Sequence, residues 1–363
     1  MADYNTQIVI LGAGIGGCIA ALALAPFYSV VLVDQQIEPQ ARVGECLAPA
    51  AGRILHKLGL LDLLTEGHLN SHGLLSYWGS EIPTLVDQLA NPDGHGWYLN
   101  RQLFEQQLRQ RVQRRGITCL WPASFRNSEQ QVNGWVLDIQ HNDKPIQLHS
   151  QLVIDATGRH SRFARALGIS RHNLDQQLSV WLTALVKVRK HISVLSSVPE
   201  GWWYSAPLPE LPYVGARVVD AEQPEGQARL FALQMQAGQF DKNLSLSSAA
   251  FLQAAAKAPG LNTLVQQIIL GTETLHGVVA ANSSKLQQGC GEGWFAIGDA
   301  ALSFDPLSSQ GIFNAMATAM QLADLLMEHG LKHKDTAALY QAQLDSIWQH
   351  YLTHKNHYYA LAV

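Results

Sequence analysis

One stretch near the N-terminus constrains the fold of this chain more than any other. The apolar, β-branched run at residues 7–11 predicts a buried strand, and the small apolar residues 15–25, which stop at Pro26, predict a buried helix. A second strand is predicted at residues 29–34. Three glycines spaced G-x-G-x-x-G join the first strand to the helix: Gly12, Gly14 and Gly17. This order predicts a β-α-β unit in a parallel sheet.

The glycines have separate physical roles in such a unit. Gly12 allows a tight turn, Gly14 lets a pyrophosphate approach the backbone, and Gly17 lets the helix pack closely on the sheet. Asp34 follows at about the 20-residue spacing at which a carboxylate can hold ribose hydroxyls. An ordinary strand–turn–helix is the alternative reading, but the complete order favours a dinucleotide site. The site is expected to include the helix start and the residue after the acid: Ile15, Gly16 and Gln35.

Composition narrows the class of protein. The 363 residues suffice for two domains or one large one, and the net charge of −4 without a basic block argues against a nucleic-acid partner. Four scattered cysteines show no metal-ligand spacing, which favours free thiols in a reducing compartment and no metal site. We expect no signal peptide and no membrane span, because no apolar run reaches about 18 residues. A cytoplasmic location is therefore expected.

Two further segments are candidates to contact a cofactor. Residues 40–49 form a predicted loop, read either as a solvated turn or as a strap on a cofactor with Arg42 near a phosphate or ribose. The strap would also include Gly44, Glu45 and Cys46. Arg101 begins a helix predicted at 101–115 and capped by Asn100, where it could reach a phosphate or form a surface ion pair. The arginines at 109, 111, 114 and 115 are expected on its solvated face.

The middle of the chain predicts a change from mixed α/β to antiparallel structure. A helix is expected at 50–64, strands at 72–78, 95–99 and 117–121, and a hairpin of 135–139 with 145–149 across residues 142–143. A buried strand at 151–155 runs into Asp155-x-x-Gly158, which could face a nucleotide or form a plain turn into a helix at 163–167. Strand-like runs at 178–188, 201–206, 213–219 and 229–236 then predict an antiparallel sheet and a second domain. Helices at 245–258 and 261–270 and a strand at 272–281 follow.

A second nucleotide-type motif lies near the C-terminus. A strand predicted at 294–297 ends in Gly298–Asp299, and a loop then passes Pro306 to a helix predicted at 311–327. Gly298 permits close approach of the backbone, and Asp299 can accept a hydrogen bond from a ribityl or ribose hydroxyl. The helix beginning at Gly311 and Ile312 would aim its positive end at whatever lies above it, where an anionic group such as a reduced flavin would be favoured. Residues 336–360 predict an aromatic-rich helix that packs on the nucleotide-binding part.

These three motifs together resemble those of the flavoprotein monooxygenases of the para-hydroxybenzoate hydroxylase type. The resemblance implies an α/β fold with a Rossmann-like FAD-binding domain of glutathione reductase type, an inserted antiparallel substrate domain and C-terminal helices. The FAD-binding domain would comprise residues 1–75, 98–176 and 285–363, and the substrate domain 76–97 and 177–284. Asp34 would bind the adenosine ribose and Asp299 the ribityl chain. Arg42 and Arg101 would lie by the cofactor, and the segment after Pro306 beside the isoalloxazine ring.

Two subgroups share shorter stretches with this chain. V-G-E-C-L-A-P at 43–49 and G-W-W-Y-S-A-P-L at 201–208 resemble segments of flavin-dependent tryptophan halogenases. Those enzymes need a lysine downstream of the first segment, and none occurs here between Lys57 and Lys144, so halogenation is not expected. The stretches at 96–101, 201–204 and 357–361 look like those of flavoproteins that mature tryptophylquinone amine oxidases of the glycine oxidase or lysine oxidase type. Such proteins are thought to hydroxylate a tryptophan of a precursor protein.

The resulting hypothesis is FAD-dependent hydroxylation of an electron-rich aromatic by O2 through a flavin C4a-hydroperoxide. The substrate could be a free aromatic or a tryptophan in the precursor protein of a quinone-cofactor oxidase. The sequence has a single dinucleotide fingerprint, which FAD would occupy. We therefore expect NAD(P)H to bind transiently, or a partner reductase to supply the electrons. Substrate-side candidates are Trp203, Tyr204 and His72. The alternatives are a flavin-dependent reductase of an isoprenoid or other apolar substrate, and a maturation factor that binds FAD weakly.

Overall fold

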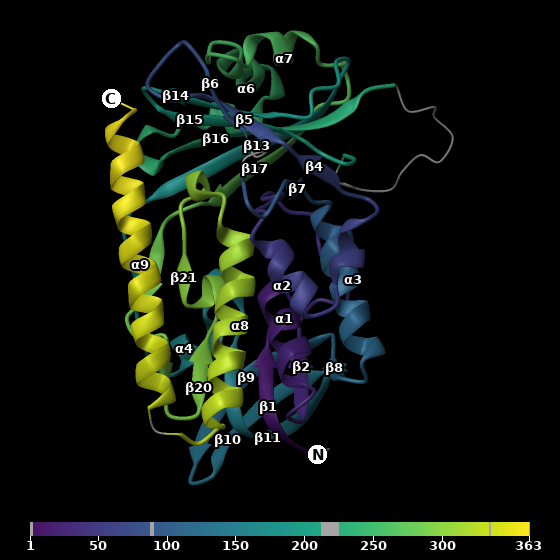
Figure 1. The fold of residues 1–363 in the computed structure, drawn as a ribbon, viewed down its shortest axis with the longest axis vertical. Helices are drawn as coiled ribbons and strands as arrows, with labels where there is room; N and C mark the ends of the chain where they lie inside the picture. Colours follow the sequence, from purple (N-terminus) through teal and green to yellow (C-terminus); the bar gives the residue numbers. More distant parts are fainter. Residues whose placement is uncertain (1–2, 88–90, 212–224, 334, 363) are drawn as a thin grey trace.

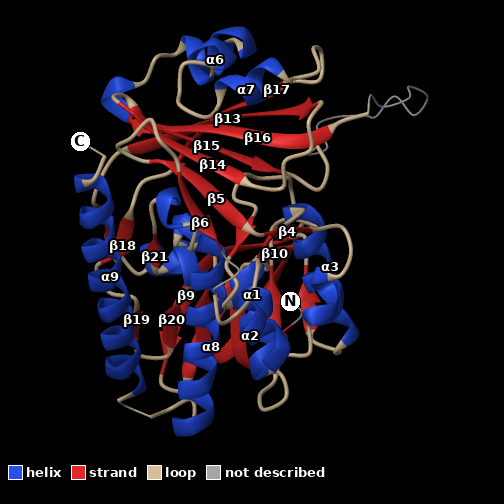
Figure 2. Ribbon diagram, turned by 45° about the horizontal axis from the view of Figure 1, so that its top comes forward, coloured by secondary structure: helices blue, strands red, loops and turns tan. Residues whose placement is uncertain are grey.

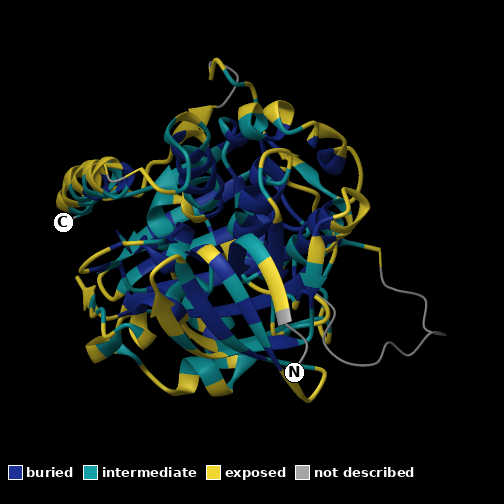
Figure 3. Ribbon diagram, turned by 90° about the horizontal axis from the view of Figure 1, so that it is seen from below, coloured by how far each residue is buried: buried dark blue, intermediate teal, exposed yellow. Residues whose placement is uncertain are grey.

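The computed structural model describes residues 3–87, 91–211, 225–333 and 335–362. Two large sheets lie one above the other, and the long helix α9 (Thr336–Ala360) runs along one side past both of them (Figure 1). Figure 2 shows helices gathered on the outer faces of the two sheets. Figure 3 shows the buried residues concentrated in the strands and the exposed residues in outer loops and along α9.

The eight-stranded sheet carries the predicted β-α-β unit. Its central strands follow the order β19-β20-β11-β1-β2-β8, and the pairs β20/β11, β11/β1, β1/β2 and β2/β8 are parallel. Because helices cover the sheet, β2 is buried at every position. The strands are β1 (Asp3–Leu11), β2 (Val30–Val33), β8 (Thr118–Leu120), β9 (Ala123–Gln131), β10 (Gly134–His141), β11 (Lys144–Asp155), β19 (Cys290–Gly291) and β20 (Trp294–Ala296).

Close helix packing places the N-terminal ends of two helices side by side. Helix α1 (Ile15–Leu24) packs against α8 (Gly311–His329) and α3 (Arg101–Arg114). A Cβ at Gly16 would lie 3.2 Å from the carbonyl oxygen of Ala315 on α8, so a larger residue would separate the two helices. The short helix α2 (Ala51–Lys57) also packs against α8, whereas α4 (Arg162–Ala166) packs on β9 and β11.

The seven-stranded sheet is antiparallel except for one pair. Its order is β17-β13-β16-β15-β14-β5-β6, with β14 parallel to β5. Helices α5 (Asn243–Leu246), α6 (Ser248–Ala255) and α7 (Asn262–Gln266) cover one face, and the other face is turned toward the eight-stranded sheet (Figure 1). The strands are β5 (Gly73–Tyr77), β6 (Thr84–Asp87), β13 (Gln177–Val186), β14 (Ser193–Val198), β15 (Gly201–Pro207), β16 (Gln227–Gln236) and β17 (Thr274–Ala280).

Two three-stranded sheets lie where the chain passes between the large sheets. The first joins β3 (Cys46–Leu47), β4 (Leu69–Ser71) and β7 (Gly96–Tyr98), and the chain enters the seven-stranded sheet from β4 and returns to β7. The second joins β12 (Arg171–Asn173), β18 (Ser284–Leu286) and β21 (Leu302–Ser303), with entry from β12 and return to β18. These small sheets therefore fix the position of the two large ones.

The predicted fold class, a parallel α/β sheet joined to an antiparallel sheet, is confirmed. Several boundaries differ. Residues 145–149 and 151–155 form one continuous strand, β11, because its two ends pair with different neighbours. The helix expected at 50–64 ends at Lys57, and the left-handed Gly59 (φ +66°) turns the chain into a separate short helix, Leu61–Leu64. The helix expected at 245–258 divides at Ser247, whose side chain caps α6.

Among the described residues, nine strands were missed: β3, β4, β6, β9, β12, β14, β18, β19 and β21. One strand prediction falls outside the described residues. β6 lies in the predicted loop 83–94, and β9 and β14 have polar sequences without clear alternation of buried side chains. The strand predicted at 213–219 lies in the part that the structure does not describe. The domain limits given above remain a prediction. Within the described ranges, no helix is both long and apolar enough to cross a bilayer.

Candidate functional site

A cavity of about 710 Å³ lies between the two large sheets. Its floor is formed by the segments that follow the carboxyl ends of β1, β2, β11 and β20, where open α/β sheets bind their ligands. Its roof is the lower face of the seven-stranded sheet. The volume lies within the roughly 300–1,000 Å³ typical of small-molecule and cofactor pockets.

The glycine turn is tightly packed at two of its glycines and open at the third. Gly12 has φ +105°, and a Cβ there would collide with the carbonyl oxygen of Ala156. A Cβ at Gly17 would collide with the carbonyl oxygen of Gly12, so Gly17 holds α1 against the turn. In contrast, no atom lies within 4 Å of a Cβ placed on Gly14, which lines the cavity. The space over Gly14 is therefore open to a ligand, as are the positions over Gly158 and Gly311.

Asp34 lines the cavity beside this turn. Its carboxylate accepts from the Ala13 amide at 2.6 Å and the Gln36 amide at 2.7 Å, and Arg109 Nη2 lies 3.2 Å away. A carboxylate has about four lone-pair positions, so capacity remains for a ribose hydroxyl. Gln35 also lines the cavity.

Arg109 is not on a solvated face, as the helix pattern predicted. It is 5% exposed, and its Nε donates to the Ala13 carbonyl at 3.0 Å. Its Nη1 donates to the carbonyl of Gln36 at 2.7 Å. Arg109 therefore ties α3 to the glycine turn and to Asp34. The i,i+4 sequence of charges Arg101–Glu105–Arg109 was the available signal, since these residues share one face of α3.

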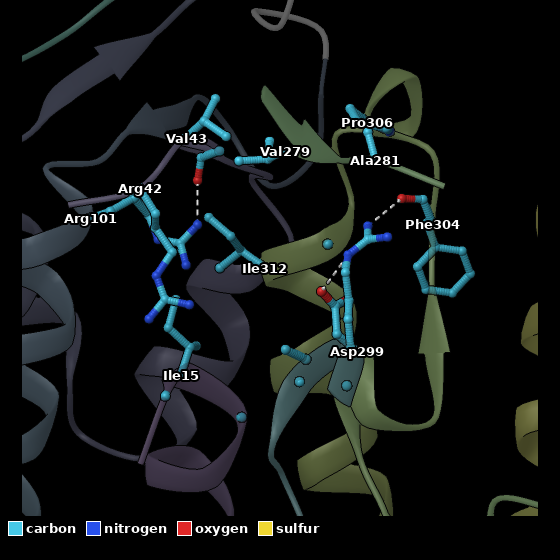
Figure 4. A pocket seen from close by; sticks show the side chains of 18 of the residues that line it. Ile15, Arg42, Val43, Arg101, Val279, Ala281, Asp299, Phe304, Pro306 and Ile312 are labelled. Atoms are coloured by element: carbon cyan, nitrogen blue, oxygen red, sulfur yellow. Dashed lines mark hydrogen bonds and ion pairs between the residues drawn. The ribbon is translucent and has the colours of Figure 1, made fainter. Parts of the chain in front are cut away.

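The predicted strap runs along one side of the cavity, where Arg42, Gly44, Glu45, Cys46 and Arg101 all line it. Buried Glu105 accepts from Arg42 Nη2 at 2.8 Å and from Arg101 Nη2 at 2.7 Å, so both guanidinium groups are engaged within the protein. Arg101 also donates to the Gly44 carbonyl (Figure 4). The buried Nε of Arg101 has no hydrogen-bond partner, which leaves one donor for a cofactor oxygen.

Asp155 lies outside the cavity, although it was a candidate to face the nucleotide. It is fully buried, and its carboxylate accepts from the amides of Thr157, Phe163 and Ala164 and from the Thr157 hydroxyl. Burial raises the pKa of this carboxyl, against the effect of these hydrogen bonds. Asp155 therefore fixes the turn into α4, while Gly158, with φ +66°, lines the cavity.

The Gly298–Asp299 motif lines the opposite side of the cavity from the strap (Figure 4). Gly298 donates to the Thr318 hydroxyl at 2.9 Å, which joins this turn to α8. The Asp299 carboxylate lies 3.6 Å from Arg159 Nε, and Arg159 in turn donates to the carbonyls of Asn282 and Phe304. Arg159 lines the cavity but was not predicted. Pro306, Gly311 and Ile312 line it as expected of the predicted site.

The substrate-side candidates do not all lie on the face of the roof that lines the cavity. Trp202 and Tyr204 line the cavity, whereas Trp203, between them on β15, points to the helix-covered face and packs on Phe251 with ring centroids 4.9 Å apart. Strand alternation requires this division. His72 is exposed and does not line the cavity; its ring packs against that of His95. Trp203 and His72 thus lie away from the space in which a substrate would sit.

Glu45 and Tyr204 meet between the strap and the roof. Glu45 is 3% exposed, and its Oε1 has no hydrogen-bond partner. Burial raises the pKa of Glu45, while the adjacent Tyr204 hydroxyl partly opposes that effect. Burial, together with the charge of Glu45, raises the pKa of Tyr204 well above its usual value. Burial thus works against the charged form of each side chain.

Helix α9 does more than pack on the nucleotide-binding sheet. Three residues on one face of it, Tyr351, Lys355 and Tyr359, contact Asp305, which lines the cavity just before Pro306. Lys355 Nζ also lies 2.6 Å from Asp175, in the connection from β12 to β13. Burial works against the charge of Lys355, but the two carboxylates raise its pKa above the ordinary value. The i,i+4 spacing was the only sequence signal for this cluster.

The residues of the cavity fit FAD. Open backbone positions over Gly14, Gly158 and Gly311 leave room for close contact, and the helices α1 and α8 both begin at the cavity. Helix N-termini favour phosphates and other anions. The unpartnered Nε of Arg101 supplies a further donor.

Comparison with known proteins identifies the family. The sequence matches the FAD binding domain family over residues 5–343. The putative FAD-dependent oxidoreductase LodB of Marinomonas mediterranea is 27% identical over an alignment of 372 positions. This alignment covers 99% of this chain and 93% of LodB.

Solved structures share the fold. The flavin-dependent halogenase CmlS superposes with a TM-score of 0.80 at 21% identity, covering 96% of this chain and 63% of CmlS. The peptidyl tryptophan dihydroxylase QhpG, essential for tryptophylquinone cofactor biogenesis, superposes with a TM-score of 0.75 at 18% identity, covering 99% of this chain and 76% of QhpG. Together with the glycine turn and the cavity, the family match shows that this chain belongs to the FAD binding domain family and is an FAD-dependent oxidoreductase of the monooxygenase type.

Proposed function

We propose that this protein hydroxylates an electron-rich aromatic substrate with O2, using FAD. The observation that carries the proposal is that one cavity joins the cofactor-binding turns to an aromatic roof. The glycine turn and the Gly298–Asp299 motif form its floor, and Trp202, Tyr204 and Leu230 contribute to its roof. A substrate ring under this roof would lie next to the cofactor.

Bound reduced FAD would supply the two electrons that divide O2 between the substrate and water. The chain's own residues would bind, orient and exclude water. The N-termini of α1 and α8 would hold anionic groups, Asp34 a ribose hydroxyl and Asp299 a ribityl hydroxyl. The apolar roof residues Leu230 and Ala232 would keep water from the reacting ring. Glu45 lines the cavity and, in its ionised form, would accept the proton that the hydroxylated ring carbon releases.

The electron donor would act without a second dinucleotide site of its own. One G-x-G-x-x-G fingerprint occurs in the sequence, and FAD would occupy it. NAD(P)H would therefore bind transiently, or a partner reductase would deliver the electrons.

Halogenation is not proposed. Among the described residues that line the cavity there is no lysine to hold hypohalous acid.

The finer proposal is that the substrate is a tryptophan of a precursor protein of a quinone-cofactor oxidase. Its support is the similarity to LodB along almost the whole chain and the shared fold with QhpG, which is a peptidyl tryptophan dihydroxylase. A tryptophan side chain fits the chemistry of the site, because the indole ring is electron-rich and the roof is aromatic.

The test is a single-turnover reaction. FAD-loaded protein is reduced without oxygen, mixed with O2 and either a tryptophan-containing peptide or free indoles and phenols, and the products are analysed by mass spectrometry. Gain of one oxygen atom by an aromatic probe, with less hydrogen peroxide than in its absence, is expected. Stoichiometric peroxide with every probe would contradict the proposal. Failure of the wild-type protein to bind FAD would remove its basis.

A further inference from the structure

Two buried acceptor atoms in the roof region lack any hydrogen-bond partner. They are Oε1 of Glu45, on a residue 3% exposed, and Oε1 of Gln234, on a residue 4% exposed. Both residues line the cavity. An acceptor buried without a donor costs free energy, so each such atom calls for a ligand or water donor.

The orientation of Gln234 is fixed by its neighbour. Its Nε2 donates to the Ser179 hydroxyl at 2.9 Å across the β13/β16 pair. The amide nitrogen is therefore engaged within the sheet, and the oxygen is the part left without a partner.

The strand register relates Gln234 to the part of the roof beside Glu45. Gln234 on β16 is directly opposite Trp202 on β15, and Tyr204, two residues on, is opposite Ala232. Glu45 lies beside Tyr204. Gln234 and Tyr204 are diagonal neighbours, whose backbones lie about 7–8 Å apart in an antiparallel pair, so they belong to the same part of the roof. The small side chain of Ala232 leaves space between them.

The rest of this part of the cavity is apolar. Leu74, Leu195 and Leu230 line it with Ala232, and these side chains offer no hydrogen bond. A purely hydrocarbon ligand would fill the space but leave both acceptors unpaired. A ring that carries a donor would fill the same space and satisfy at least one of them.

We propose that Glu45 and Gln234 form a subsite that selects aromatic rings bearing an N–H or O–H donor, such as indoles and phenols, over hydrocarbon rings of the same shape. The subsite deepens the proposed function and rests on it for the identity of the cavity. Glu45 keeps an acceptor oxygen in either protonation state, so selection persists whether or not it is charged. The titratable and charged groups that interact with Glu45 are Tyr204 on β15, Tyr98 on β7, Cys46 on β3 and Arg101 on α3.

Binding to the FAD-loaded protein without turnover tests the subsite. Dissociation constants for indole and 1-methylindole, and for phenol and anisole, are measured from the change in flavin absorbance. We expect the donor-bearing member of each pair to bind at least about tenfold more tightly, since an unpaired site polar group penalises the analogue. Equal affinities within both pairs, or no binding of indole and phenol, would overturn the proposal.

Variants distinguish an effect on aromatic-ligand preference from an effect on FAD binding. Glu45→Gln keeps an acceptor and should keep the preference, whereas Glu45→Leu and Gln234→Leu should each reduce it toward unity. Leu195→Val, which alters the roof without removing a polar atom, is the matched control. FAD affinity and thermal unfolding are measured for each, because a Glu45 that serves FAD instead would lower FAD affinity and leave the preference unchanged. Preference retained in both leucine variants rejects the subsite.

The two proposals fail in different ways. Oxygenation of an aromatic probe without donor preference would reject the subsite and leave the proposed function standing. Donor preference with only peroxide as product would reject the proposed function and leave the subsite standing.

Discussion

The Tyr359 hydroxyl donates to Asp305 Oδ2 at 2.7 Å, and this contact joins the C-terminal helix to the loop that lines the cavity. The same hydroxyl accepts from Trp202 Nε1 at 3.0 Å, so one oxygen connects α9, the Asp305 loop and the roof. Asp305 is 1% exposed and therefore depends on partners from the protein.

Replacement of Tyr359 by Phe should destabilise the protein by about 1–3 kcal/mol, because the buried Asp305 carboxylate loses the hydroxyl that donates to it. The free energy of unfolding in urea measures the effect. Tyr358→Phe, at the adjacent position that is 53% exposed, is the control and should change stability by less than about 0.5 kcal/mol. Equal effects of the two substitutions would show that the Tyr359 hydroxyl contributes nothing.

Replacement of Lys355 by Met should cost about 3–5 kcal/mol, because two carboxylates, Asp175 and Asp305, lose their shared cation in a buried setting. Lys57→Met provides the comparison, since the Lys57–Asp324 pair is exposed on both sides and contributes at most about 1 kcal/mol. Adding Asp305→Asn to Lys355→Met should recover part of the loss. No recovery would indicate that the charge balance at Asp305 is not the cause.

Arg109→Met should destabilise the protein by about 3–5 kcal/mol and weaken FAD binding, because Asp34 and the Ala13 carbonyl lose a buried partner. Urea unfolding and FAD titration measure the two effects. Arg114→Met, at an exposed position on the same helix, should leave both near the wild-type values. If the two arginine variants had the same stability and the same FAD affinity, the buried contacts of Arg109 would contribute to neither.

Gly14→Ala should leave folding intact and weaken FAD binding at least about tenfold, or about 1.4 kcal/mol. Gly14 has φ −75°, and its added Cβ meets no protein atom within 4 Å, so it would occupy only ligand space. Gly238→Ala, also without a neighbour within 4 Å, is the control. FAD titration and thermal unfolding distinguish the outcomes. Unchanged FAD affinity would place the pyrophosphate elsewhere.

Glu45 should make stability fall as pH rises from its ordinary pKa toward its raised pKa in the folded state. Its pKa is raised in the folded state, so the folded protein binds more protons than the unfolded chain between the two pKa values, and the free energy of unfolding drops with pH there. Glu45→Gln should lack this fall and become the more stable protein at neutral pH. Urea unfolding at several pH values compares them, with Glu38→Gln at an exposed position as control. A constant difference between Glu45→Gln and wild type across this range would be inconsistent with a raised Glu45 pKa.

Local motifs were predictable, and contacts between distant segments were not. The glycine turn, the Asn100 cap and the tight turn at 142–143 follow from the allowed backbone angles of a few consecutive residues, and the structure has them. Tyr359 and Asp305 are far apart in sequence, and nothing local in either segment indicates the other. Arg109 lies on a charged face of α3, where charge ordinarily signals solvent, so its burial required the strap and the glycine turn to be placed first.

The orientation of β15 shows a second limit. Alternation predicts that Trp203 and Tyr204 face opposite sides of the sheet, but not which side faces the cofactor. That choice depends on where α6 packs, and Phe251 of α6 takes the Trp203 side. The sequence therefore identified the right strand while leaving the lining residues undecided.

The strands of the eight-stranded sheet are interrupted in the sequence by strands of the other large sheet, and this order has a consequence for synthesis on the ribosome. β20 pairs with β11, yet the strands β13 to β17 are made between them. β1 pairs with one edge of β11, and β10 pairs with Lys144–Ser150 on the other edge. Only Val153–Asp155 therefore remain unpaired on that second edge until β20 is made. A gap this short presents little edge for aggregation. The nascent chain can thus hold a nearly finished nucleotide-binding sheet while strands β13 to β17 of the roof are translated, and the α9 contacts with Asp305 form last.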